Sequence, residues 1–129
     1  NWNESHEAAV QVISQGLLDE KLLHGSLDQV LETQAFNQFY MHRTGHWLGM
    51  DVHDVGDYQV EDNWRELEAG MVFTVEPGIY VSPSQAIDSR WHNIGIRIED
   101  NVLVTKHGHE VLTRDVPTDP NEIEALMLA

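Results

Sequence analysis

The feature that most restricts the fold is a glycine-rich stretch with three histidines, residues 42–56 (HRTGHWLGMDVHDVG). Its glycines interrupt helical periodicity, so this backbone is expected to be extended or looped. His42 and His46 are four residues apart, a spacing that places two metal ligands on one face of a helix. The neighbouring glycines argue against a helix, so that simple motif is not expected to apply. Together the histidines nevertheless suggest part of an active site.

Helical patterns precede this stretch and strand patterns follow it. Apolar residues at helical spacing predict a helix over about 4–23, with Gly25 as its stop. Ser26 and Gln29 have the spacing of a capping box, which opens a short second helix through Leu31. Strands are predicted at 71–75, 79–81, 94–99, 101–105 and 110–112, with a loop at 82–93, a hairpin turn at 106–109 and an acidic helix at 121–127. No repeat or linker is visible, so residues 1–129 are expected to form a single unit.

The charge of the chain restricts its partners. The chain has 129 residues, the length of one ordinary domain, with 7 basic and 22 acidic residues and a net charge of -15. This charge opposes binding to nucleic acids or anionic membranes, because long-range repulsion slows association. Metal ions and other cationic partners are favoured instead.

The chain has no cysteine, which excludes disulfides and thiolate ligands. Any metal must therefore be held by His, Asp or Glu. The absence of cysteine fits a reducing compartment, so we expect a cytoplasmic protein. No apolar run has the length of a membrane span, and no membrane partner is expected. The sequence begins with Asn1, which suggests a processed piece or a fragment.

Glu76 follows a β-prone run directly and is fixed there by Pro77 and Gly78. Burying an unpaired carboxylate costs several kcal/mol, so a buried Glu76 needs a cation or strong hydrogen bonds. The alternative is a glutamate that faces solvent from a turn.

The predicted strand 94–99 separates apolar from charged side chains. Alternation places Ile94, Ile96 and Ile98 on one face, where they are expected to fill the core. Arg97 and Glu99 share the other face, about 7 Å apart along the strand. A structural ion pair explains these two residues equally well.

The other histidines are less informative. His53 alternates with its neighbours and can share a strand face with Asp51, and a surface histidine is the alternative. His6 and His24 lie near predicted helix ends, where solvated side chains are expected.

Together the histidines and carboxylates favour two hard divalent cations, bound mainly by carboxylate oxygens and by one imidazole. Such a pair lowers the pKa of a bridging water and polarises a carbonyl group under attack. Composition and spacing lead only as far as a metal-dependent hydrolase.

Three segments closely resemble the pita-bread metallopeptidase family, and most closely its bacterial aminopeptidase P members. They are residues 46–56 (HWLGMDVHDVG), 67–80 (LEAGMVFTVEPGIY) and 95–100 (GIRIED), in the family's order and with similar spacing. The family also includes prolidase, methionine aminopeptidase and creatinase. The resemblance implies an α+β fold, with a curved antiparallel sheet and flanking helices. It also implies removal of the N-terminal residue from peptides with proline in second position, by attack of a metal-bound hydroxide.

The resemblance also implies a role for individual residues. His46 matches a ligand of one metal, Glu76 a ligand and proton acceptor, and Glu99 the carboxylate that bridges both metals. The metals of the family are usually Mn²⁺, and sometimes Co²⁺ or Zn²⁺. His42 and His53 match histidines that contact the substrate and stabilise the intermediate. Arg97 matches the arginine that braces the carboxylates.

Two departures from the family pattern bear on these expectations. Arg43 stands where relatives often have glycine. The family's two aspartate ligands come from an earlier segment, and no matching pair precedes His42. The chain is therefore expected to be the C-terminal half of the catalytic domain, without the N-terminal domain of aminopeptidase P. A lone half leaves apolar surface open, so we expect a homo-oligomer with little or no activity of its own.

Two other functions fit the same motifs. Prolidase cleaves Xaa-Pro dipeptides, but its members often have a longer insertion than the short segment 80–94 of this chain. A pita-bread protein without catalysis can serve as a peptide-binding or interaction module. Such proteins usually lose metal ligands, whereas His46, Glu76 and Glu99 are all present here.

Overall fold

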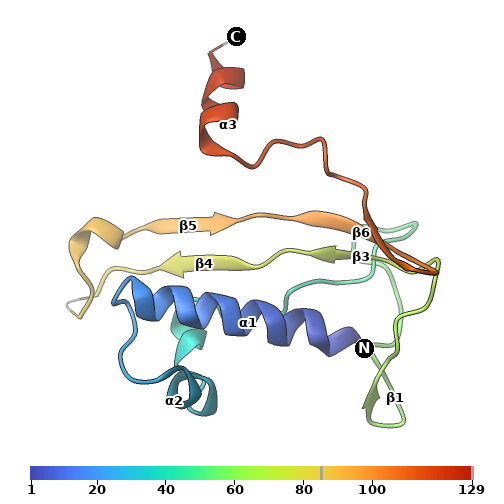
Figure 1. Cartoon of the computed structure of the whole chain (residues 1–129), viewed down its shortest axis with the longest axis horizontal. Coiled ribbons are helices and arrows are strands. Elements are labelled where there is room, and N and C mark those ends of the chain that lie inside the picture. The colour runs from blue at the N-terminus through green and yellow to red at the C-terminus, as the bar shows by residue number, and fades with distance from the viewer. Residues whose placement is uncertain (85, 129) are drawn as a thin grey trace.

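A computed structural model describes residues 1–84 and 86–128 of the chain. The N-terminal third forms helices, and a long β-hairpin lies beside the first of them (Figure 1). Gln85, within the predicted loop 82–93, and Ala129, at the end of the predicted unit, lie outside the described residues. Within the described residues, no helix has both the length and the apolar character needed to cross a membrane.

Helix α1 (Trp2–Asp19) begins two residues earlier and ends four residues earlier than the sequence predicts. Its start is fixed by the Asn1 side chain, which accepts a hydrogen bond from the Asn3 amide at 3.0 Å. Its end is fixed by Lys21, whose φ of 60° turns the backbone out of the helix. The amides of Leu22 and Leu23 then both bond to the Leu17 carbonyl. This turn directs Leu23 into the core, where it is buried.

Two short helices pack against α1. The predicted cap of α2 (Leu27–Glu32) is confirmed, because Ser26 Oγ accepts a hydrogen bond from the Gln29 amide at 3.2 Å. A 3-10 helix, η1 (Ala35–Gln38), follows. Together with α1 they enclose one apolar core, whose buried members include Val10, Leu17, Val30, Phe36 and Phe39.

Four of the five predicted strands form one long antiparallel hairpin (Figure 1). Its first arm is β3 (Val72–Val75) and β4 (Gly78–Val81), and its second arm is β5 (Ile94–Arg97) and β6 (Asp100–Thr105). A two-residue turn at 106–107 leads to β7 (Gly108–Val111), which pairs with β6. The predicted strand 94–99 is thus shorter than expected, because the ladder stops after Arg97.

The interruption of the hairpin leaves its register unchanged. Val75 pairs with Asp100 on one side of the gap, and Gly78 pairs with Arg97 on the other. Pro77 lies inside the gap and has no N–H to donate to a ladder. The continuous register places Glu76 opposite Glu99.

The remaining elements lie around the hairpin. A second core contains Trp2, Trp47, Phe73 and Val102, so the start of α1 packs near β3 and β6. The short strands β1 (Gln59–Val60) and β2 (Asn63–Trp64) pair with each other, and the sequence patterns do not predict them. The 3-10 helix η2 (Ser89–Trp91) lies between β4 and β5. The predicted acidic helix is present as α3 (Pro120–Met127), which projects from the body with all its residues exposed (Figure 1).

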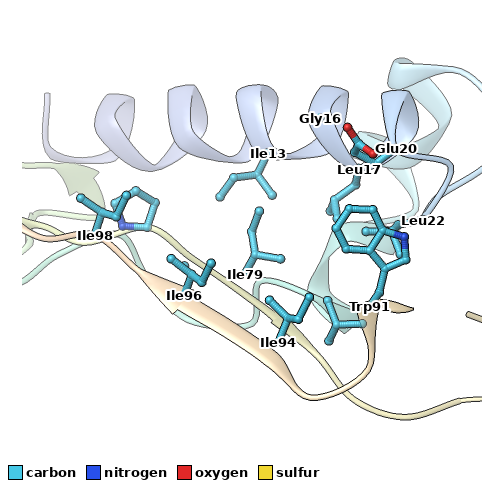
Figure 2. Close-up of a pocket in the computed structure, with 13 residues that line it drawn as sticks. Ile13, Gly16, Leu17, Glu20, Leu22, Ile79, Trp91, Ile94, Ile96 and Ile98 are labelled. Atoms are coloured by element: carbon cyan, nitrogen blue, oxygen red, sulfur yellow. The ribbon is translucent and has the colours of Figure 1, made fainter. Parts of the chain in front are cut away.

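The isoleucine face of β5 borders an open apolar cavity (Figure 2). Its volume is about 360 Å³, and its walls are α1 and the β4–β5 hairpin. Ile94, Ile96 and Ile98 point into it, as alternation predicts. The prediction that they fill a core is wrong for two of them, since Ile96 is 60% exposed and Ile98 is 48% exposed. The cavity separates them from α1, so their apolar surface stays accessible.

Candidate metal centre

The first part of the histidine stretch runs as an extended segment beside β3. The amide of Leu48 donates to Val72, the amide of Thr74 donates to His46, and the amide of Glu76 donates to the Thr44 carbonyl at 2.6 Å. Gly45 permits this close approach, because a Cβ at that position would lie 1.8 Å from the Thr74 carbonyl oxygen. The prediction of extended rather than helical backbone is confirmed here.

The imidazole of His46 is oriented by its own neighbour. Its Nδ1 lies 2.9 Å from the Trp47 carbonyl oxygen, so Nδ1 carries a proton and donates it. In the neutral ring, Nε2 then presents a lone pair, and it lies 3.2 Å from Glu76 Oε1. A lone pair and a carboxylate repel each other at this distance. A cation or a proton between the two groups removes the repulsion.

Glu76 is partly buried, with 15% of its side chain exposed. Its Oε1 accepts a hydrogen bond from Thr74 Oγ1 at 2.9 Å, and Thr74 Oγ1 accepts one from the His46 amide at 3.0 Å. Its Oε2 lies 3.6 Å from Arg97 Nε. Glu76 is therefore held on both oxygens, and the alternative of a solvated glutamate in a turn is wrong.

Glu99 lies across the hairpin from Glu76. Arg97 Nη2 is 3.7 Å from Glu99 Oε2, so one guanidinium contacts both carboxylates. The two interpretations of Arg97 and Glu99 therefore both hold. The residues form an ion pair, and Glu99 also belongs to a cluster of possible metal ligands.

His46, Glu76 and Glu99 bring one ligand atom each to within 4.8 Å of one another. An imidazole nitrogen with two carboxylates is a donor set suited to divalent first-row metals. Among the described residues, Arg97 is the one positive side chain that contacts these two carboxylates, so without a metal its charge alone offsets theirs. The residues present therefore fit a divalent cation.

The other two predicted histidines are not members of this cluster, and of the two only His53 contacts one of its residues. The His53 side chain is exposed, and its ring meets that of His46 edge-on, with 4.3 Å between centroids. His42 is more enclosed, and its Nε2 lies 3.0 Å from the Tyr80 hydroxyl. Its Nδ1 lies 2.7 Å from the Arg43 carbonyl oxygen, to which it donates. The proton on Nδ1 leaves Nε2 as acceptor for the Tyr80 hydroxyl.

Arg43 points away from the cluster. Its guanidinium donates to Asn3 Oδ1 on α1 and lies 4.9 Å from the centre of the Trp64 ring. Arg43, which stands where relatives often have glycine, therefore links the loop to α1 through a hydrogen bond.

Some residues around the site were not predicted from the sequence. Thr74 lies two residues before Glu76 on the same strand face, so strand alternation contained the signal for it. The prediction of a solvated His6 is wrong: its Nδ1 lies 2.9 Å from the hydroxyl of buried Thr44. Burial lowers the pKa of His6 below its ordinary value of 6.5, and the charge of Arg43 lowers it further. No local pattern in the sequence indicates this contact.

The chain is similar to known metallopeptidases in sequence and in fold. The model of metallopeptidase family M24 matches residues 1–106. The Xaa-Pro aminopeptidase of Haemophilus influenzae is 48% identical over 96% of the chain, which spans 29% of that protein. Aminopeptidase PepP of Pseudomonas aeruginosa superposes with a TM-score of 0.95 at 56% identity, over 99% of this chain and 29% of that one. Escherichia coli aminopeptidase P, solved with the inhibitor Pro-Leu, superposes with a TM-score of 0.85 at 41% identity, over 97% and 32%.

These proteins fix both the fold and the family. The chain spans less than a third of the length of each of them. Its α+β architecture is that part of the pita-bread fold, as the resemblance implies. The chain belongs to metallopeptidase family M24.

Proposed function

We propose that this chain supplies one side of the active site of a metal-dependent Xaa-Pro aminopeptidase. One observation carries the proposal: His46 Nε2 and the carboxylates of Glu76 and Glu99 converge to within 4.8 Å. Two facing carboxylates beside an imidazole lone pair are a donor set suited to divalent first-row metals, and a bound cation would remove the repulsion among them. Residues 1–129 act in this proposal as a single unit within the catalytic domain, in the cytoplasm.

The convergent residues would hold the metals. His46, Glu76 and Glu99 would help to hold two divalent ions, Mn²⁺ in the first place and Co²⁺ or Zn²⁺ as substitutes. Bound there, the ions would lower the pKa of a water and polarise the scissile carbonyl. Glu76 would accept the proton of that water, since its Oε1 already faces the centre.

The other residues would act on the substrate or on the carboxylates. His53 contacts His46, whereas His42 contacts Tyr80, and both histidines would donate to the oxygen that gains negative charge during attack. In this structure His42 Nε2 accepts a hydrogen bond from the Tyr80 hydroxyl, so the ring would gain a proton on Nε2 or change tautomer before it donates to the substrate. Arg97 would hold Glu76 and Glu99 in place through its two ion pairs.

The proposed substrate is a peptide with proline in second position. The relatives that match nearly the whole chain are Xaa-Pro aminopeptidases, which supports this specificity. The peptide Pro-Leu inhibits the related Escherichia coli enzyme. Such a dipeptide has the chemistry expected of the part of the substrate that begins with proline.

A hybrid enzyme tests the proposal. Residues 1–128 replace the matching segment of the Pseudomonas aeruginosa enzyme, and release of the first residue from an Xaa-Pro tripeptide is measured with Mn²⁺. We expect activity in the hybrid, a loss of at least about a hundredfold in Glu99→Gln, and none for the 129-residue chain alone. A folded hybrid without activity contradicts the proposal.

The same assay separates the competing functions. A hybrid that cleaves the Xaa-Pro dipeptide but not the tripeptide indicates a prolidase. A folded hybrid that binds Xaa-Pro peptides without cleaving them indicates a binding module.

A further inference from the structure

Thr44 connects three parts of the molecule. It is 2% exposed, and it lies in the extended segment beside β3. Its hydroxyl contacts His6 Nδ1 at 2.9 Å and also the Tyr40 hydroxyl. Its carbonyl accepts the amide of Glu76 at 2.6 Å. The single hydroxyl of Thr44 therefore has two hydrogen-bond partners, and one of them, His6, belongs to α1.

The three groups of this network form one continuous hydrogen-bonded chain. The Thr44 hydroxyl can donate one hydrogen bond and accept others, so it joins the Tyr40 hydroxyl to His6 Nδ1 in either tautomer of His6. Burial raises the pKa of Tyr40 above its ordinary value, so its hydroxyl keeps its proton.

Tyr40 extends this network to His42. The two rings meet edge-on with 5.1 Å between centroids, and the Tyr80 ring also contacts His42, with 5.5 Å between centroids. His42 therefore contacts two tyrosines. Tyr40 is 1% exposed, so its ring cannot move without disturbing the core.

We propose that His6 is a positioning residue: through the hydroxyl of Thr44 it fixes the amide of Glu76 and, through Tyr40, the ring of His42. Its attachment to α1 makes the helix a support for the site, together with the contact between Asn3 and Arg43. The importance of His42 and Glu76 rests on the proposed function, whereas the mechanical role of His6 does not.

Nuclear magnetic resonance of the 129-residue chain, without metal or peptide, tests this role. His6→Leu removes the hydrogen-bond partner of Thr44 and keeps a side chain of similar size, whereas His6→Asn places a polar amide group near the position of Nδ1. We expect His6→Leu to speed hydrogen exchange of the Glu76 amide about tenfold and to shift the His42 ring resonances. The β6–β7 amides keep their protection. His6→Asn restores the Glu76 amide and the His42 resonances towards wild type, an effect that loss of packing alone does not produce.

Matched variants make the result decisive. His24→Leu changes an exposed histidine and is expected to alter neither reporter. If His6→Leu fails to fold, Thr44→Val and Thr44→Ser replace the pair, with protection of Glu76 lost in the first and kept in the second. The proposal is overturned if His6→Leu changes neither the exchange rate of the Glu76 amide nor the His42 resonances. It is also overturned if His6→Asn behaves like His6→Leu, or if His6→Leu lowers the protection of all amides equally. An inactive hybrid enzyme would contradict the proposed function without changing these exchange rates.

Discussion

Glu76 and Glu99 stand opposite each other across the hairpin, at the point where its ladder is interrupted. Like charges placed directly across a strand pair destabilise a sheet. Arg97 contacts both carboxylates, at 3.6 Å and 3.7 Å. Repulsion between the two carboxylates therefore destabilises the hairpin locally, and a bound divalent cation would remove this repulsion.

Replacing Arg97 should increase the repulsion between Glu76 and Glu99, because the positive charge that contacts both is lost. We expect Arg97→Ala to lower the free energy of unfolding by about 1 kcal/mol, a value that allows for the half-exposed position of the arginine. Arg97→Lys should lose less, because it keeps the charge. Urea denaturation at low and at high salt checks this. A loss that is equal at both salt concentrations would assign the effect to packing rather than to charge.

Gly45 should tolerate no side chain. A Cβ there would lie 1.8 Å from the Thr74 carbonyl, so Gly45→Ala is expected to cost about 1–3 kcal/mol and to weaken the pairing that holds His46. Gly16→Ala is the matched control. Gly16 lies inside α1 with open space around it, so alanine should stabilise the chain by about 0.5–1 kcal/mol. Thermal denaturation should show a lower melting temperature for Gly45→Ala and a higher one for Gly16→Ala than for wild type.

The stability of the chain should depend on pH through His6. Its folded pKa lies below the ordinary value of 6.5, so the unfolded chain takes up the proton first. Stability is therefore lost as the pH falls through about 6.5, and the loss stops growing below the folded pKa. His6→Asn lacks this term. Denaturation between about pH 7.5 and 5.5 should show a steeper loss in wild type than in the variant, and parallel curves would contradict this origin.

The open isoleucine face should drive self-association. Ile96 and Ile98 line the cavity beside α1 and are largely exposed. We expect sedimentation at micromolar concentration to give a mass above that of one chain, and Ile96→Lys to reduce it. Val12→Lys is the control, since Val12 is also exposed but does not line this cavity. A strictly monomeric wild-type chain would contradict the prediction.

Local patterns in the sequence predict much of this fold. The strands around Glu76 and Glu99 follow from β-prone runs and alternation, and the cap at Ser26 follows from its spacing to Gln29. The end of α1 does not follow, because Leu22 continues the helical pattern while the turn at Lys21 takes it elsewhere. Tertiary burial of Leu23 decides this boundary rather than helix propensity.

Local sequence patterns also predict the site only in part. Resemblance to known motifs named the residues that converge, His46, Glu76 and Glu99. The contact between His6 and Thr44 joins residues 38 positions apart, and no periodicity encodes such a pairing. The exposure of Ile96 was missed because alternation tells which face a side chain occupies, and not whether another element covers that face.

The metal content of the hybrid enzyme tests the central claim most directly. After dialysis against Mn²⁺ and removal of free ions, elemental analysis should find about two ions per active site in the hybrid. Glu99→Gln and His46→Ala should each lose at least one, while His24→Ala should keep both. Two ions retained at unchanged affinity in both Glu99→Gln and His46→Ala would contradict the assignment of these residues as ligands.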